Sequence, residues 1–277
     1  MSDNLVSTQW LNDHLNDVVI IDASWHLPAA KRDAKAEFVS QHIPGAVFYD
    51  LDAGAATNTT LPHMLPAAEK FSADLLALGV SKNDLVVCYD SAGLFSAARL
   101  WWMLKSFGHA KVAVLDGGLP KWERDGFSVA TGVARPKQSS GFKAQLDLSK
   151  VQTLSDVATA IAAKSAQIAD ARSASRFHGE EPEPRPGVKP GHMAGAFNVH
   201  YASLLNADGT LKSGQALRDA FESKGIDLNS PIITSCGSGV TAAILSLGLT
   251  ELGTTQHSLY DGSWAEWGAS GEDVVVG

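Results

Sequence analysis

The 277-residue chain contains one pattern twice, and this repeat constrains its fold more than any single motif. Short apolar segments that end in Asp-Ala lie at residues 18–23 and 166–171, an offset of roughly 145 to 150 residues. Three further matches follow in the same order: 42–46 with 192–196, 86–87 with 232–233, and Asp116-Gly117 with Trp122 matched by Asp261-Gly262 with Trp267. Four ordered matches predict two copies of one domain.

Each copy alternates short β-branched segments with longer segments of helical periodicity. In the first copy this spacing is seen in Ala97, Leu100, Trp101, Leu104 and Phe107. Alternation of this kind favours parallel strands joined by helices. The sequence therefore predicts an α/β fold in which each copy is a parallel sheet with helices on both faces.

The boundary between the copies is predicted in a polar stretch without periodicity, residues 127–150. We expect an N-terminal domain over 1–135, a linker over 136–150 and a C-terminal domain over 151–277. An apolar content of 45% is ample for two cores.

Composition argues against several classes of function. The net charge is −8, and Lys and Arg do not cluster with aromatic residues, so nucleic acid is not an expected partner. The sequence lacks an apolar run long enough to span a bilayer and an N-terminal signal pattern, which predicts a cytoplasmic protein without a membrane partner. Two cysteines without zinc-type spacing predict neither a disulfide framework nor a metal site.

Cys236 follows a strand-like segment and is followed by small residues and then a helix-like segment from Ala242. Backbone N–H groups and the positive end of a helix dipole converge at such a position, which favours a thiolate and can also hold a persulfide anion. We therefore predict that Cys236 is the nucleophile of a sulfur-transfer reaction. Cys88 lies within the apolar segment 85–89 and is interpreted as a buried packing residue.

Counting back from the two Asp-Gly pairs aligns Cys236 with Ser91, beside Asp90. Neither residue is a thiol. The first copy is therefore predicted to lack the nucleophile and to build a wall of the cleft.

The segment Cys236-Gly237-Ser238-Gly239-Val240-Thr241 resembles the cysteine loop of tandem-domain rhodanese-like sulfurtransferases. The resemblance covers nearly the whole chain, including the Asp-Ala strand ends and the closing segment 261–267. Members that prefer thiosulfate have basic residues directly after the cysteine, whereas the 3-mercaptopyruvate type has the loop seen here. The resemblance implies transfer of the sulfur of 3-mercaptopyruvate through a Cys236 persulfide to cyanide or a thiol, including a thioredoxin-like protein, with release of pyruvate and without a metal or organic cofactor.

The resemblance also implies the site residues. Arg176 and Arg185 would hold the carboxylate and ketone of the substrate, although locally they could be surface residues balanced by Glu180, Glu181 and Glu183. Ser238, His63 and Asp52 would form a proton relay beside the nucleophile. The backbone that would cradle the outer sulfur belongs to Gly237, Gly239, Val240 and Thr241. His42 and His192 are assigned capping or packing roles.

Two other functions remain open, and a third is disfavoured by the sequence. A cysteine phosphatase or arsenate reductase would have an arginine six positions after the cysteine, where this chain has Ala242. Thiosulfate sulfurtransferase activity is the nearest enzymatic alternative. A persulfide carrier or binding module without turnover would also retain Cys236.

Overall fold

The computed structural model describes residues 3–133 and 135–277, so residues 1, 2 and 134 of the predicted N-terminal domain lie outside the described residues. The chain forms two compact units. Unit 1 contains Met1–Ala56, Leu65–Asp147 and Asn206–Leu211; unit 2 contains Thr57–Met64, Leu148–Leu205 and Lys212–Gly277. Each unit therefore includes a short segment from the other half of the sequence.

The linker over 136–150 stays a prediction. Residues in its first part have defined contacts within unit 1: the Ser139 hydroxyl donates to the Val80 carbonyl at 2.6 Å, and the Ala144 N–H donates to the Ser72 hydroxyl at 2.9 Å.

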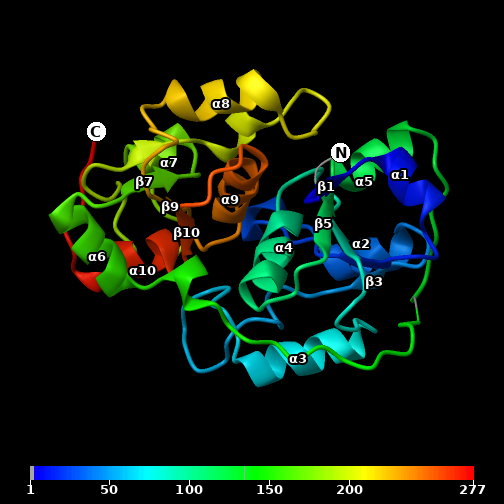
Figure 1. The fold of residues 1–277 in the computed structure, drawn as a ribbon. Coiled ribbons are helices and arrows are strands. Elements are labelled where there is room, and N and C mark those ends of the chain that lie inside the picture. Colours follow the sequence, from blue (N-terminus) through cyan, green and yellow to red (C-terminus); the bar gives the residue numbers. More distant parts are fainter. Residues whose placement is uncertain (1–2, 134) are drawn as a thin grey trace. The chain divides into compact units, whose positions relative to one another are not determined.

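Unit 1 is built around a five-stranded parallel sheet with strand order β1-β5-β4-β2-β3 (Figure 1). Its strands are β1 (Leu5–Val6), β2 (Val19–Asp22), β3 (Val47–Phe48), β4 (Val86–Tyr89) and β5 (Val112–Leu115). Its helices are α1 (Thr8–Asp13), α2 (Ala34–Ser40), α3 (Ala68–Ala77), α4 (Ala97–Ser106) and α5 (Gly118–Arg124), with a 3-10 turn at Pro28–Ala30.

Unit 2 repeats this topology with the parallel order β6-β10-β9-β7-β8. Its strands are β6 (Val151–Gln152), β7 (Gln167–Asp170), β8 (Phe197–Asn198), β9 (Ile232–Ser235) and β10 (His257–Tyr260). Its helices are α6 (Leu154–Ala163), α7 (Ala174–Phe177), α8 (Gly214–Glu222), α9 (Ala242–Glu251) and α10 (Ser263–Ser270), with 3-10 turns at Leu148–Lys150 and Tyr201–Leu204. The predicted α/β fold and its duplication are confirmed.

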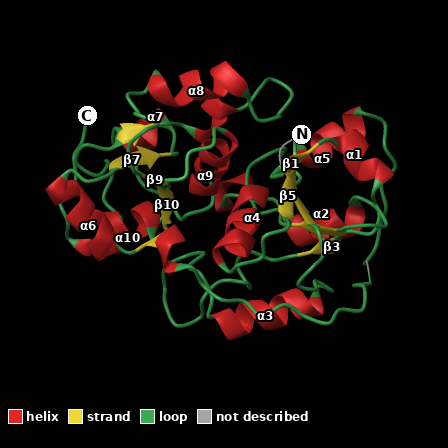
Figure 2. Ribbon diagram, viewed as in Figure 1, coloured by secondary structure: helices red, strands yellow, loops and turns green. Residues whose placement is uncertain are grey.

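Helices cover both faces of each sheet (Figures 1 and 2). In unit 1, α4 packs on β4 and β5, while residues of α1, α2 and α5 form a buried cluster with the opposite face that includes Leu11, Phe38 and Trp122. In unit 2, α9 packs on β9 and β10, and α6 and α10 cover the opposite face through a cluster that includes Val157 and Trp264. No helix among the described residues is long and apolar enough to cross a membrane.

The repeated histidines have the predicted structural role. His42 follows α2, its Nδ1 lies 2.7 Å from the Phe38 carbonyl oxygen, and its ring stacks on Phe38. His192 contacts the Phe177 carbonyl of α7 at 2.9 Å and stacks on Phe177. Both rings therefore cap a short helix and pack against it, as predicted.

The strand register corrects the predicted equivalence of Ser91 with Cys236. Tyr89 pairs with Asp22, and Ser235 pairs with Asp170, so the residues that follow the two strands, Asp90 and Cys236, are equivalent. The loop before the next helix spans residues 91–96 in unit 1 and 237–241 in unit 2. Counting back from Asp-Gly failed because the loop of unit 1 is one residue longer.

The strand ends at Asp22 and Asp170 are equivalent in position but differ in charge compensation. Both side chains are buried. In unit 2, Asp170 forms an ion pair with Arg172. In unit 1 the residue equivalent to Arg172 is Ser24, and its backbone N–H donates to the Asp22 carboxylate at 2.8 Å. Burial, opposed in part by the hydrogen bonds to Ser24, raises the pKa of Asp22 to about 6.

Asp22→Asn should change how the stability of the protein depends on pH. Because the pKa of Asp22 is raised to about 6 on folding, the folded protein binds more protons than the unfolded chain between about pH 4 and 6, and stability is lost as the pH rises through that window. The asparagine does not titrate, so the variant does not lose stability in this way. Its free energy of unfolding, measured with urea, should improve relative to wild type by up to about 3 kcal/mol between pH 4 and 7. A difference that does not change with pH would contradict this assignment.

Candidate active site

Cys236 lies directly after β9, the middle strand of the unit 2 sheet. The carboxyl ends of parallel strands are where open α/β sheets place their ligand sites. A cavity of about 510 Å³ in unit 2 lies at the opposite end of the sheet, beside Gln167 at the start of β7 and Pro231 just before β9, and is separate from this site. Cys236 itself is 2% exposed.

The loop after Cys236 is fixed by the N-terminus of α10. The carbonyls of Cys236 and Gly237 accept hydrogen bonds from the N–H groups of Trp264 and Ala265, both at 2.9 Å. The N–H of Cys236 donates to the Ser263 hydroxyl at 3.3 Å. Further along the loop, Gly239 has a φ of +78°, a conformation that favours glycine. Val240 is buried, and Thr241 is the residue before α9.

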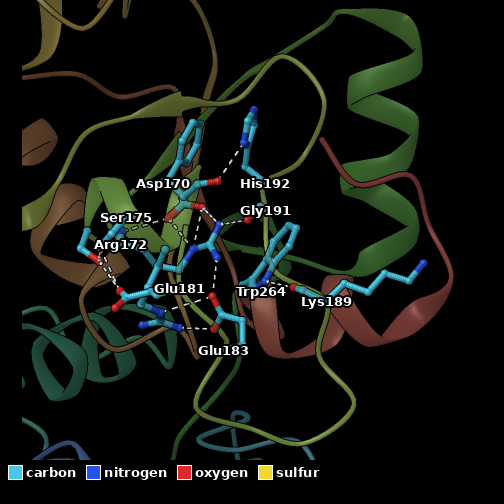
Figure 3. Close-up of polar contacts among 12 residues, drawn as sticks. Asp170, Arg172, Ser175, Glu181, Glu183, Lys189, Gly191, His192 and Trp264 are labelled. Atoms are coloured by element: carbon cyan, nitrogen blue, oxygen red, sulfur yellow. Dashed lines mark hydrogen bonds and ion pairs between the residues drawn. The ribbon is translucent and has the colours of Figure 1, made fainter. Parts of the chain in front are cut away.

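A buried arginine, Arg172, lies at the same edge of the sheet (Figure 3). Its guanidinium forms a bidentate pair with Asp170, with contacts of 2.7 to 3.1 Å, and also donates to the Gly191 carbonyl at 2.8 Å and to Glu183 at 2.9 Å. It also lies over the Trp264 ring, 4.3 Å from the centroid. Burial lowers the pKa of Arg172, but the two carboxylates outweigh it and raise the pKa above its ordinary value.

Glu183 connects this pair to Arg176. One Glu183 oxygen binds both arginines, the other binds Arg176 NH2, and the Glu183 side chain is only 4% exposed. These bonds use the Nε and NH2 atoms of Arg176. A methyl group added at Gly237 would lie 3.1 Å from Arg176 NH2 and 3.4 Å from NH1. The outer end of the guanidinium therefore lies over the residue next to Cys236.

Arg185 lies on the proline-rich loop that carries Glu183, and its side chain is half-buried. The end of this loop is fixed to α10: the Lys189 carbonyl accepts the Trp264 indole N–H at 2.9 Å, and the Lys189 N–H donates to the Gly268 carbonyl at 2.9 Å (Figure 3). The two predicted arginines thus lie on either side of Glu183 in the sequence.

Ser238 and His63 lie together, as the predicted relay requires. The His63 Nδ1 atom is 2.9 Å from the Ser238 hydroxyl, both side chains are buried, and the segment Thr57–Met64 belongs to unit 2. His63 has a φ of +58°, an uncommon conformation for a residue other than glycine. Strain of this kind in a buried histidine is consistent with a functional position.

Asp52, the third predicted member of the relay, belongs to unit 1. Its carboxylate accepts a hydrogen bond from the Trp25 indole at 3.1 Å. Its role beside His63 stays a prediction.

In unit 1 the turn after the middle strand surrounds the carboxylate of Asp90. The Asp90 carboxylate accepts the N–H groups of Phe95, Ser96 and Ala97 on one oxygen and of Ala92 on the other, at 2.8 to 2.9 Å. A side chain at the end of the middle strand can thus be surrounded by backbone donors of the following loop and helix. Cys236 occupies the equivalent position in unit 2.

The two free cysteines differ in where they lie in the sheet. Cys88 is fully buried within β4, whereas Cys236 lies in the loop that follows β9. Burial raises the pKa of the Cys88 thiol, which fits the predicted packing role. Within residues 3–133 and 135–277, no group of three or more His, Cys, Asp or Glu side chains could hold a metal ion.

The contacts of Arg172 and Glu183 were not predicted from the sequence. Glu183 was interpreted as one of three surface carboxylates, because a charged residue in a proline-rich loop gives no local sign of burial. Arg172 did carry a signal: it directly follows the Asp-Ala strand end of the second copy, where the first copy has Ser24. A charged residue that stands at the carboxyl edge of the sheet in one copy but not in the other indicates a contact that only that copy makes.

Comparison with known proteins identifies close relatives. The rhodanese-like domain family matches residues 7–125 and 153–270. The human 3-mercaptopyruvate sulfurtransferase is 41% identical over 98% of this chain and 94% of its own length. The thiosulfate/3-mercaptopyruvate sulfurtransferase 2 of Arabidopsis thaliana is 42% identical over 99% of this chain and 86% of its own. The crystal structure of the 3-mercaptopyruvate sulfotransferase SseA from Escherichia coli superposes with a TM-score of 0.86 at 40% identity, covering 94% of this chain and 98% of that one.

Arg172→Met should destabilise the protein by about 3 to 5 kcal/mol, because it leaves the buried Asp170 and Glu183 carboxylates without their shared cation. The measurement is the free energy of unfolding in urea. Arg218→Met is the control: it removes the exposed Arg218–Glu222 pair of α8 and should change stability by no more than about 0.5 kcal/mol. Equal effects of the two substitutions would show that the Arg172 network has no special energetic role.

Proposed function

The chain belongs to the rhodanese-like sulfurtransferase family, and from this premise we propose that it transfers the sulfur of 3-mercaptopyruvate through a Cys236 persulfide to a thiol acceptor or cyanide. The observation that carries the proposal is the position of Arg176. Its guanidinium lies over Gly237, beside the nucleophile, and is held there by a buried carboxylate. This is a site for a small carboxylate that bears a sulfur atom.

Arg176 and Arg185 bind the carboxylate and ketone oxygens of the substrate. Glu183 occupies the Nε side of the Arg176 fork and leaves the NH1 side for the substrate. This division orients the fork before the substrate arrives, which lowers the entropic cost of binding.

The Cys236 thiolate attacks the substrate sulfur, an S–S bond forms and the C–S bond breaks. The electron pair of the C–S bond goes to the carbon as the enolate of pyruvate, which the ketone stabilises. The proton of the substrate thiol ends on that carbon, so the products are pyruvate and the Cys236 persulfide anion. The balance needs no oxidant or reductant, and the proposal includes no metal or organic cofactor.

Ser238 and His63 move the proton in this proposal. The 2.9 Å contact between the Ser238 hydroxyl and the His63 imidazole gives a path for one proton, and Asp52 would fix the tautomer of the ring. The backbone N–H groups of Gly237, Gly239, Val240 and Thr241 hold the outer sulfur until an acceptor removes it.

The acceptor in this proposal is a small thiol or a thioredoxin-like protein, and cyanide serves in the assay. A thiol acceptor and a free catalytic cysteine both require a reducing compartment, so we include a cytoplasmic location in the proposal.

Thiosulfate is the alternative donor, since the name of the Arabidopsis relative includes it. The charge of the site favours mercaptopyruvate. Thiosulfate carries two negative charges, but residues 237–241 contain no cation, and Glu183 neutralises much of Arg176.

Cys236→Ser should reduce turnover with 3-mercaptopyruvate to the uncatalysed rate, since a neutral hydroxyl does not replace the thiolate as a sulfur nucleophile. The measurement is steady-state release of pyruvate with cyanide as the acceptor, with thiosulfate assayed in parallel by formation of thiocyanate. Cys88→Ala, which removes the buried thiol of β4, is the matched control and should retain activity.

The wild-type result separates the alternatives. A preference for 3-mercaptopyruvate supports the proposal, and a preference for thiosulfate contradicts the assigned donor. A single release of pyruvate per chain, without turnover, would instead identify a persulfide carrier.

Arg176→Lys should raise the KM for 3-mercaptopyruvate about tenfold or more and change kcat less. A lysine keeps the charge but cannot bind Glu183 with one edge and the substrate with another. Arg218→Lys on α8 controls for the general effect of this substitution. An unchanged KM would remove Arg176 from the substrate site.

A further inference from the structure

Ser263, the first residue of α10, has a backbone conformation that disfavours its own side chain. Its φ is +49°, and the side chain is fully buried. Among the other described residues apart from glycines, Lys31, His63 and Lys164 also have positive φ. The two lysines each end a helix, where this conformation is common, and His63 contacts Ser238. Ser263 instead begins a helix beside the proposed nucleophile, so the conformation needs another reason.

The first copy of the fold has a glycine at this position, where an added methyl group would lie only 2.5 Å from the Asp90 carbonyl oxygen. Gly118 follows the equivalent Asp-Gly pair and has a φ of +56°. The N–H of the next residue, Leu119, donates to the Asp90 carbonyl at 3.0 Å, as the N–H of Trp264 donates to the Cys236 carbonyl at 2.9 Å. Glycine adopts this conformation without a steric penalty. Unit 2 therefore differs from unit 1 at this position by the presence of a side chain.

The Ser263 hydroxyl makes two hydrogen bonds that glycine cannot make. It accepts the N–H of Cys236 at 3.3 Å and donates to the Tyr260 carbonyl at 2.8 Å. One hydroxyl thus connects the carboxyl ends of β9 and β10 at the nucleophile.

A second difference lies two residues later. The Ala265 N–H donates to the Gly237 carbonyl at 2.9 Å. The equivalent residue in unit 1 is Pro120, which has no N–H. Unit 1 thus lacks both the hydroxyl and the N–H that make these additional bonds in unit 2. Unit 1 also has Asp90 in place of a cysteine after its middle strand.

We propose that Ser263, Trp264 and Ala265, here called the α10 clamp, position Cys236 and its loop for sulfur transfer, and that the Ser263 hydroxyl is a positioning group of the reaction. The inference rests on the proposed function. The clamp fixes the carbonyls of Cys236 and Gly237 toward α10. Because the C=O and N–H of a trans peptide point in opposite directions, the N–H groups of Gly237 and Ser238 point away from α10.

Unit 1 shows where such an N–H points. The residue equivalent to Ser238 is Ala92, and its N–H donates to the Asp90 side chain at 2.9 Å. In this proposal, the Ser238 N–H is directed toward the Cys236 side chain in the same way. The proposed role of the clamp is thus to direct a backbone donor at the sulfur atom that becomes negatively charged.

The test replaces Ser263 by the residue that unit 1 uses. Ser263→Gly should leave the melting temperature unchanged or raise it, because glycine relieves the strain of the positive φ. It should lower kcat with 3-mercaptopyruvate about tenfold, because the sulfur loses its fixed position, and leave KM unchanged, because Arg176 and Arg185 lie outside the clamp. If Ser263 had only a structural role, replacing it would not give an enzyme that is more stable but has a lower kcat.

Two more variants separate the bonds of the clamp. Ala265→Pro copies Pro120 of unit 1, removes the bond to Gly237 and should also lower kcat at unchanged KM. Ser263→Ala removes the hydroxyl and keeps the strained conformation, so it should match the kcat of Ser263→Gly but have a lower melting temperature. The control is Ser270→Ala at the end of α10, where the hydroxyl bonds only within its own helix and turn, and activity should not change.

A second readout keeps the inference separate from the proposed donor. The rate at which iodoacetamide alkylates Cys236, followed by mass spectrometry at fixed pH, should be several-fold lower in Ser263→Gly than in wild type. If wild type uses neither sulfur donor, the proposed function fails, and the alkylation rate alone decides the role of the clamp. Wild-type kcat and a wild-type alkylation rate in Ser263→Gly would overturn the inference.

Discussion

The buried Arg172 guanidinium holds the proposed site together. It joins the end of β7 through Asp170, the loop before β8 through Gly191, the proline-rich loop through Glu183 and α10 through Trp264. Burial of an ion pair is costly unless the remaining hydrogen bonds are satisfied, and here the partners of Arg172 lie on four segments. Through Glu183, the same network sets the position of Arg176 over Gly237.

The two units place different residues at the same position of one fold. In unit 1 the middle strand is followed by Asp90, whose carboxylate accepts the backbone N–H groups of its own loop, so these donors are already occupied. In unit 2 a cysteine stands there, and the additional bonds from Ser263 and Ala265 fix its loop. The unit 1 residues at those two positions, Gly118 and Pro120, are compatible with the same backbone but make neither bond. The two units therefore differ in a few residues at one edge of the same sheet topology.

Prediction from the sequence succeeded where the signal was local or repeated. The parallel sheets follow from the alternation of strand and helix patterns, and His42 and His192 cap and pack against helices as the repeat indicated. The equivalence of Ser91 with Cys236 was wrong, because one inserted residue in the loop of unit 1 shifts the count while the strand register is preserved. Asp52 and Arg185 keep their predicted roles as proposals.

The sequence by itself determined the duplicated α/β fold, the presence of a cysteine directly after the middle strand in the second copy alone and the loop that follows it, since these depend on periodicity and on residues next to one another. The tertiary structure decided which distant groups meet: His63 contacts Ser238 across 175 positions of the chain, and Glu183 is buried between two arginines instead of exposed. It also revealed the strained Ser263 against Cys236. Such contacts depend on how strands and loops far apart in the chain converge at one sheet edge, and no local pattern of residues encodes that convergence.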